Sequence, residues 1–221
     1  MLLCDVPQGQ EGRPSKSLTY DQAAALLAAA EDRPLYAYIV VSLLTGARTE
    51  ELRALTWSHV DLGASPPVIM VWHSVRAGGY TKTRKSRRTL ELPRRCADAL
   101  LLHRDRQDQF RKRVGDRWHD NDLVFASRVG TALWAGNVRR SFRAVLAVAG
   151  LDPADWTPRE LRHSFVSLMS DAGVPIEKIA RLVGHTGTTT TETVYRKQIR
   201  PVVVGGAQVM DSLFPTRDGN A

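Results

Sequence analysis

Five separated segments of the chain carry side chains that could bind and attack a phosphodiester. In chain order they are Arg48 in TGARTEEL, Lys82 in TKTRKSRR, Arg162 in TPRELRHS, His185 in LVGH and Tyr195 in TTETVYRK. Arginine suits an anionic phosphate because its planar guanidinium stays charged and donates two parallel hydrogen bonds. A tyrosine near such cations could attack phosphorus as a nucleophile. The ordered set therefore predicts a pocket that holds a phosphodiester and cleaves it.

Each of these residues, taken alone, also fits an ordinary structural role. Arg48 could pair with a neighbouring glutamate on the surface, and Arg162 could lie on a solvated helix face. His185 could donate to a backbone carbonyl, Tyr195 could pack against the core, and Lys82 could be a plain phosphate contact. The prediction rests on the combination of all five and not on any single one.

The composition favours a polyanionic partner and weighs against several other functions. The 221 residues carry a formal charge of +8, which favours nucleic acid, although a solvated basic surface without a partner has the same charge. The cysteines and histidines show no metal-ligand spacing, and no phosphate-binding glycine loop or nucleophile elbow occurs. There is no membrane-spanning apolar run and no signal peptide. We expect a soluble, cytoplasmic protein without a metal site.

Two β-type runs, residues 68–72 and 89–92, flank a long turn that contains Gly78 and Gly79. They predict an antiparallel hairpin. No acidic residue occurs between Leu62 and Leu90, whereas cations are frequent there. We expect this hairpin to contact DNA through its basic residues, which are Arg76, Lys82, Arg84, Lys85, Arg87 and Arg88.

Helical signals account for most of the remaining chain. Thr19 and Gln22 form a capping box before a helix to residue 30, and Pro34 begins a helix that ends near Thr45. Thr49 should cap a short helix through residue 55. Further helices are expected over residues 93–113, 137–149, 157–172, 175–184 and 192–197. The fold class is therefore α+β, mainly α-helical, with one small antiparallel β-hairpin sheet.

The helix that Thr157 should cap has two distinct faces. Arg159 and Arg162 lie one turn apart on its polar side. The opposite side is an apolar stripe, which predicts that it packs on the core through Leu161, Phe165, Leu168 and Ala172.

The combined pattern resembles the tyrosine recombinase, or phage integrase, family over residues 16–201. TGARTEELRALTW is similar to the first arginine box of the family, and TKTRKSRRTLELP is similar to its lysine hairpin. LRHS, LVGH and TTETVY are similar to its second box. The resemblance implies the catalytic-domain fold of these enzymes over residues 18–200, preceded by a linker (1–17) and followed by a tail (201–221).

The resemblance also implies a role for each position. Arg48 and Arg162 would clamp the scissile phosphate, and Lys82 would be the general acid for the 5′-oxygen leaving group. His185 would hydrogen-bond the phosphate and assist proton transfer. Tyr195 would be the nucleophile.

Two further positions follow from the same resemblance. Glu51, three residues after Arg48, matches an acidic position that supports the site from behind. Arg159 stands where the family usually has histidine, three residues before the second-box arginine. An arginine can donate to a phosphate, but it cannot readily accept the tyrosine proton because its pKa is above 12. The general-base role would then fall elsewhere or be shared with solvent.

By resemblance, the reaction forms a 3′-phosphotyrosyl bond and frees a 5′-hydroxyl. The covalent bond keeps the phosphodiester energy, so neither ATP nor a metal or other cofactor is needed. The implied partners are double-stranded DNA, a homo-tetramer on two DNA sites and a directionality factor. Residues 202–214 would dock on a neighbouring protomer or pack within their own chain. The N-terminal DNA-clamping domain of the family is absent from this chain, so we expect weak, salt-dependent DNA binding.

Three alternatives stay open at the level of sequence. The first is a non-cleaving DNA-binding module of integrase descent, which the arginine at position 159 favours. The second is an enzyme like the type IB topoisomerases, which share this chemistry. The third is a basic helical protein with no role on DNA, which requires the five matches to be chance.

Overall fold

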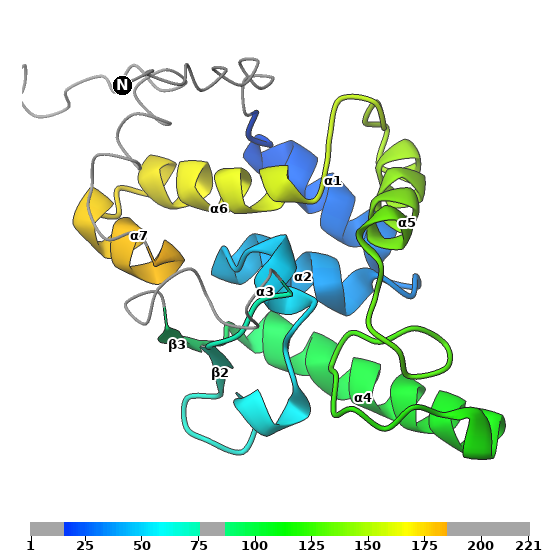
Figure 1. Cartoon of the computed structure of the whole chain (residues 1–221). Helices are drawn as coiled ribbons and strands as arrows, with labels where there is room; N and C mark the ends of the chain where they lie inside the picture. The colour runs from blue at the N-terminus through cyan, green and yellow to red at the C-terminus, as the bar shows by residue number, and fades with distance from the viewer. Residues whose placement is uncertain (1–15, 76–86, 185–221) are drawn as a thin grey trace, which may run out of the picture.

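The computed structural model describes residues 16–75 and 87–184, which form a group of helices with one small sheet at its edge (Figure 1). The helices are α1 (Tyr20–Ala30), α2 (Tyr36–Thr45), α3 (Thr49–Leu52), α4 (Arg94–Val114), α5 (Ala135–Val148), α6 (Arg159–Asp171) and α7 (Ile176–Val183). The strands are β1 (Val60–Asp61), β2 (Val68–Val71) and β3 (Arg88–Glu91). The mainly helical α+β class predicted from the sequence is confirmed.

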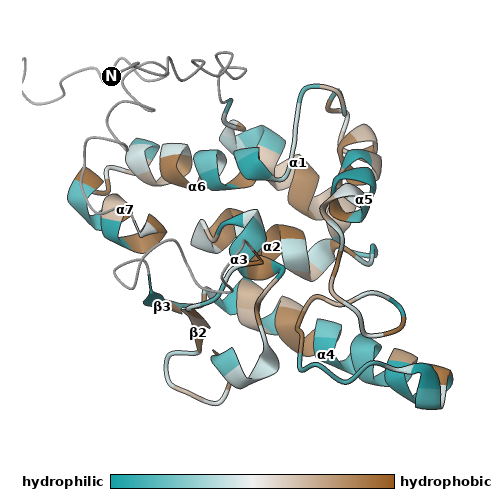
Figure 2. Cartoon of the chain, viewed as in Figure 1, coloured by the Kyte–Doolittle hydropathy of each residue, from teal (hydrophilic) through white to brown (hydrophobic). Residues whose placement is uncertain are grey.

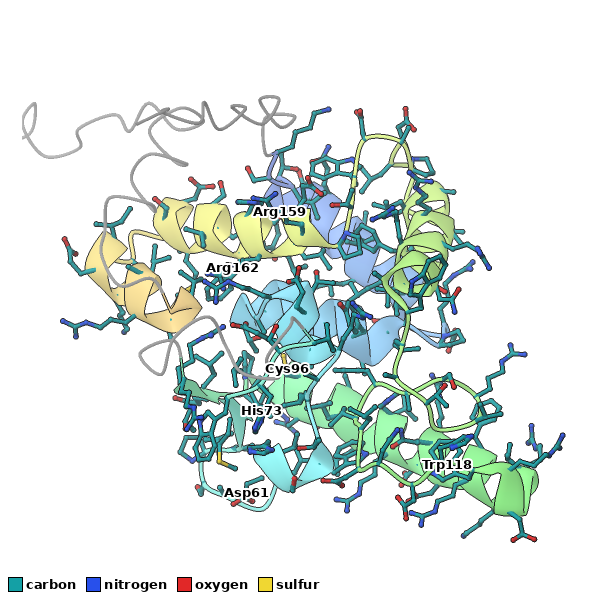
Figure 3. All side chains as sticks on the ribbon, viewed as in Figure 1. Asp61, His73, Cys96, Trp118, Arg159 and Arg162 are labelled. Atoms are coloured by element: carbon teal, nitrogen blue, oxygen red, sulfur yellow. The ribbon has the colours of Figure 1, made fainter. Side chains whose placement is uncertain are left out.

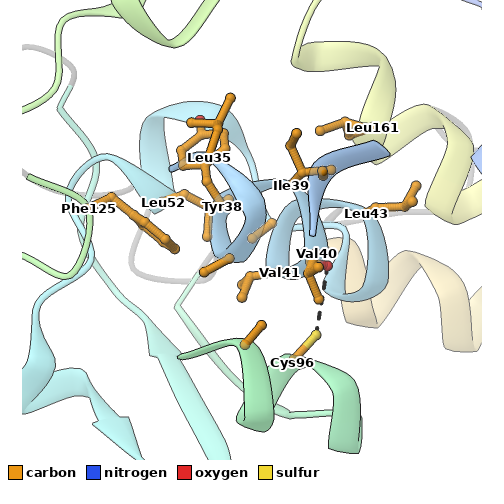
Figure 4. Close-up of a cluster of buried hydrophobic side chains, with 14 of the residues drawn as sticks. Leu35, Tyr38, Ile39, Val40, Val41, Leu43, Leu52, Cys96, Phe125 and Leu161 are labelled. Atoms are coloured by element: carbon orange, nitrogen blue, oxygen red, sulfur yellow. Dashed lines mark hydrogen bonds between the residues drawn. The ribbon is translucent and has the colours of Figure 1, made fainter. Parts of the chain in front are cut away.

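Helix α2 is the centre of the core. Its sequence YAYIVVSLLT is apolar on nearly every side, which is typical of a helix buried all round. It packs against α4 on one side and α6 on the other. Figure 4 shows its side chains between Phe125, Leu161 and Cys96, whose thiol contacts the carbonyl of Val40 at 3.8 Å. Because α2 ends at Gly46, its C-terminal end is held at a defined place beside α6.

Helix α4 leaves the core in its second half. Its buried residues, from Cys96 to Leu100, all lie in the first half, and the rest of the helix is mostly polar and basic with a few exposed apolar side chains such as Phe110 (Figure 2). Burial raises the pKa of the Cys96 thiol to about 12. Within the two described ranges, no helix combines the length and apolar character needed to cross a membrane.

The sheet has the antiparallel order β1-β2-β3, and it includes one strand that the sequence pattern did not predict. Strand β2 pairs with β3 in the register Ile69 opposite Leu90, and both side chains are buried. The predicted hairpin strands are confirmed within one residue. Strand β1 is only two residues long, too short for an alternating pattern. The turn between β2 and β3, with Arg76, Lys82, Arg84 and Lys85, lies outside the described residues.

Most predicted helices are confirmed, with corrections near the arginine boxes. The Thr19–Gln22 capping box is present at α1. Helix α2 begins two residues after Pro34, and α3 ends at Leu52 instead of residue 55. Thr49 does not cap α3: Arg48 is the N-cap, and the buried Thr49 hydroxyl makes no hydrogen bond.

Helix α6 also differs in part from its prediction. Its N-cap is Pro158 and not Thr157, whose hydroxyl and backbone N–H both donate to the Glu160 carboxylate. The apolar stripe begins as predicted, since Leu161 and Phe165 are buried. Ala172, however, is exposed because the helix ends there, beyond the core.

Gly46 lets α2 and α6 approach each other closely. It adopts the left-handed conformation, with φ +65°, at the C-cap of α2. A Cβ atom placed there would lie 2.5 Å from Cδ1 of Phe165 on α6, far inside van der Waals contact. Glycine at this position therefore satisfies both the backbone and the packing.

We predict that Gly46→Ala lowers the free energy of unfolding by about 2–4 kcal/mol, because it adds left-handed strain and a clash with a buried ring. Chemical denaturation would measure this. Gly173→Ala is the matched control, since Gly173 has a similar φ of +76° and a Cβ atom added there would meet nothing within 4 Å; only about 1 kcal/mol of backbone strain is expected there. Equal losses in the two variants would contradict the packing argument.

Candidate active site

Arg48 is positioned by a glutamate one turn further along the chain. As the N-cap of α3, its backbone N–H donates to Oε2 of Glu51 at 2.7 Å. Its side-chain Nη1 donates to the other carboxylate oxygen, Oε1, at 2.8 Å. The short segment TGARTEEL thus folds so that one carboxylate orients both the backbone and the side chain of Arg48. The arginine side chain keeps 32% of its surface exposed.

A second arginine, Arg88 at the start of β3, reaches the same carboxylate from a distant part of the sequence. Its Nη1 and Nη2 donate to Oε1 and Oε2 of Glu51 at 3.0 and 2.8 Å. The side chains of Arg88 and Glu51 are only 8% and 2% exposed. We expected Arg88 to contact DNA. That expectation stays a prediction; in the described protein the Arg88 side chain is buried against Glu51, whereas the adjacent Arg87 is exposed.

The two arginines keep Glu51 ionised in a buried place. Burial alone would raise the pKa of the Glu51 carboxyl. The hydrogen bonds and charge of Arg88, together with the charge of Arg48 and its backbone N–H, more than reverse this effect and lower the pKa to about 2. Glu51 is therefore a carboxylate at neutral pH.

Arg162 joins this group through the backbone. From α6 its Nη1 donates to the carbonyl of Gly46 at 2.8 Å, and its Nη2 donates to the carbonyl of Val183 at 2.6 Å. Figure 3 shows the side chain extending from α6 between α2 and α7. Gly46 is two residues before Arg48, so the contact ties the two arginine boxes together. We refer to Arg48, Glu51, Arg88 and Arg162 as the arginine–glutamate cluster.

Helix α7 ends at this cluster. The Nε of Arg88 donates to the carbonyl of Leu182 at 2.8 Å, next to the Val183 carbonyl that Arg162 binds. Gly184 then ends the helix in the left-handed conformation. The next residue is His185, which lies outside the described residues, as do Lys82 and Tyr195. The structure therefore brings together Arg48, Arg162 and Glu51 and does not test the other three.

The remaining predicted position, Arg159, lies at the start of α6 and is exposed (Figure 3). One residue after Arg162, the half-buried His163 was not singled out from the sequence. Burial lowers its pKa, and the nearby charges of Arg159 and Arg162 lower it further, so its imidazole is neutral near pH 7. Among the described residues, no group of three or more His, Cys, Asp or Glu side chains could hold a metal ion.

We predict that Glu51→Gln lowers the free energy of unfolding by about 3–5 kcal/mol, because it leaves buried guanidinium charge without its carboxylate. Chemical denaturation at neutral pH would show this. Glu31→Gln is the matched control, since Glu31 pairs with Arg95 at a similar 2.9 Å but both side chains are largely exposed. It should cost less than about 1 kcal/mol. A similar small loss for Glu51→Gln would contradict the buried-pair interpretation.

The depressed pKa of Glu51 also predicts a pH dependence of stability. The folded-state pKa of about 2 lies below the ordinary 4.5, so the unfolded chain binds the extra proton between these values. The stabilisation is complete above the unfolded pKa and is lost as pH falls toward the folded pKa. The stability difference between wild type and Glu51→Gln should therefore be constant near neutrality and shrink below about pH 4.5. A difference that persists unchanged to about pH 3 would refute this assignment.

Comparison with known proteins agrees with the geometry. The profile of the phage integrase family matches residues 16–199. An integrase of Streptomyces ambofaciens is 62% identical over 220 residues, which cover 96% of this chain but 57% of that protein. The chain thus spans little more than half the length of this relative.

Solved structures share the fold at low sequence identity. The XerA recombinase matches with a TM-score of 0.67 and 24% identity over 94% of this chain and 68% of that one. The Tn1549 transposon integrase, solved with circular intermediate DNA, matches with a TM-score of 0.71 and 21% identity over 92% and 68%. With most of its length matched by the family profile and its helices arranged as in these recombinases, the chain belongs to the phage integrase family.

Proposed function

We propose that this chain is the catalytic domain of a site-specific DNA recombinase that cleaves and rejoins double-stranded DNA through a 3′-phosphotyrosyl intermediate. The observation that carries the proposal is the arginine–glutamate cluster. Its Arg48 and Arg162 match the two arginine boxes of the family and lie 114 positions apart in sequence. One hydrogen bond, from the Arg162 side chain to the carbonyl of Gly46, joins the two segments. A fold that joins these boxes supplies preorganised cations for a phosphate.

In the proposed reaction, Arg48 and Arg162 hold the non-bridging oxygens of the scissile phosphate. The Tyr195 oxygen forms a bond to phosphorus while the bond from phosphorus to the 5′-oxygen breaks. Lys82 donates a proton to that leaving oxygen, and His185 hydrogen-bonds the phosphate. Rejoining is the same step in reverse with a new 5′-hydroxyl, and the phosphodiester energy is conserved throughout.

Arg159 takes the place of the usual second-box histidine in this scheme. It is exposed on the same helix as Arg162, so it can donate to the phosphate. It cannot accept the phenol proton of Tyr195 at neutral pH. We infer that this proton passes to another acceptor or to solvent.

The remaining parts of the proposal concern partners and organisation. DNA binding is supported by the net charge of +8 and by the likeness to the Tn1549 integrase, which was solved with DNA. We further propose assembly as a homo-tetramer on DNA, docking of residues 202–214 on a neighbour, control by a directionality factor and a cytoplasmic setting. Residues 1–17 serve as a linker and residues 18–200 as the catalytic domain.

The proposal predicts covalent capture of DNA that depends on Tyr195. Wild type, Tyr195→Phe and Tyr20→Phe would be overproduced in cells, lysed in denaturant, and the DNA that stays attached to the protein would be sequenced. Tyr20 is exposed on α1, so its variant is the matched control. Wild type and the control should retain DNA, and Tyr195→Phe should lose at least about 99% of it, roughly the effect of removing a nucleophile.

The other outcomes separate the alternatives. Equal recovery from Tyr195→Phe would remove Tyr195 as the nucleophile. No recovery from any variant would contradict cleavage by this chain and favour a non-cleaving DNA-binding module. Recovery of DNA without a preferred sequence, together with relaxation of supercoiled plasmid, would favour a topoisomerase-like enzyme.

A further inference from the structure

We propose that Arg88 is a positioning residue for strand cleavage: it fixes β3, Arg48 and the C-terminal end of α7 relative to one another, without contacting DNA itself. This inference rests on the function proposed above. On this inference, Arg88 affects the rate of strand cleavage and not the affinity for DNA.

A single guanidinium makes all the contacts on which this inference depends. Its Nη1 and Nη2 bind the two oxygens of Glu51 at 3.0 and 2.8 Å, and its Nε binds the carbonyl of Leu182 at 2.8 Å. Glu51 in turn holds the backbone and side chain of Arg48 at 2.7 and 2.8 Å. One residue at the base of the hairpin therefore connects β3, α3 and α7.

Arg88 contacts α7 at its C-terminal end, at the carbonyl of Leu182. The last carbonyls of a helix have no partner within the helix. Here the carbonyl of Leu182 accepts a hydrogen bond from Arg88, and the carbonyl of Val183 accepts one from Arg162. Gly184 follows with φ +67°, and a Cβ there would lie 3.1 Å from Nη1 of Arg88. Two arginines and a glycine thus fix the C-terminal end of α7, immediately before His185 in the sequence.

Lysine can replace the charge of Arg88 but not this geometry. An ammonium on a flexible stem keeps Glu51 paired, so the fold should survive the change Arg88→Lys. It lacks the planar fork, however, and cannot bind two carboxylate oxygens and a carbonyl in three fixed directions. The substitution therefore separates positioning from charge compensation.

The test measures cleavage and binding separately. The DNA site recovered by covalent capture would be placed in a nicked duplex that traps the cleaved product. Single-turnover rates at saturating DNA, and dissociation constants, would be measured for wild type, Arg88→Lys and Gly184→Ala. Arg94→Lys is the matched control, because the Arg94 side chain is 97% exposed. Thermal unfolding would confirm that each variant is folded.

We expect Arg88→Lys to lower the cleavage rate at saturating DNA about 10- to 100-fold, the loss typical of a small misplacement of reacting groups. Its dissociation constant should stay within about twofold of wild type, and Arg94→Lys should change neither quantity. Gly184→Ala disturbs the same contact from α7 and keeps every charge. It should also lower the cleavage rate without changing the dissociation constant. If Arg88→Lys does not fold, these two measurements on Gly184→Ala test the inference.

Two results would overturn the inference and leave the proposed function intact. An unchanged cleavage rate in a folded Arg88→Lys would show that its geometry is not required. A loss confined to the dissociation constant would make Arg88 a DNA contact. Wild-type protein without a Tyr195-dependent covalent complex would instead overturn the proposed function, and this inference with it.

Discussion

The arrangement of the site depends on one buried carboxylate. Glu51 is almost fully enclosed, and an isolated charge in such a place would be costly. It is tolerated because two guanidinium groups, from α3 and from β3, meet it with four hydrogen bonds, counting the backbone N–H of Arg48. Because the pairing stabilises the folded state, the same contacts that favour folding hold the start of β3 against the first arginine box. Stability and the geometry of the site are thus consequences of the same contacts.

Backbone carbonyls extend this constraint to the rest of the site. The carbonyls of Gly46, Leu182 and Val183 all lie near helix ends, where intrahelical donors are missing, and all three are bound by arginine side chains. Arginine suits this task because its several donors point in fixed directions. The helix ends of α2 and α7 therefore have their polar groups satisfied by the cations that orient the site. A lysine in place of Arg88 or Arg162 could not both satisfy the helix-end carbonyls and orient the site.

The sequence predicted the elements better than the contacts between them. The spacing of Arg48 and Glu51 and the approximate bounds of most helices follow local rules, so the sequence predicted both. The burial of Arg88 was not, because in the run KSRR it looks the same as the exposed Arg87. A signal was present in the strand: side chains alternate, and Arg88 lies on the face of the buried Leu90. Thr49 is a common capping residue, which is why the sequence predicts it as the cap of α3. In the structure the N-cap is Arg48, whose backbone N–H donates to the Glu51 carboxylate.

The arginine–glutamate cluster contains three guanidinium groups and one carboxylate. Arg48 and Arg88 pair with Glu51, whereas Arg162 binds backbone carbonyls. The pKa of the neighbouring His163 is lowered by burial and by the charges of Arg159 and Arg162. Like charges held close together by a rigid fold raise the free energy of the empty site. An anion that enters relieves this repulsion, and a phosphate that gains charge in its transition state relieves it further. Because the Glu51 carboxylate and the backbone carbonyls already hold these arginines in place, an entering phosphate would meet preorganised donors.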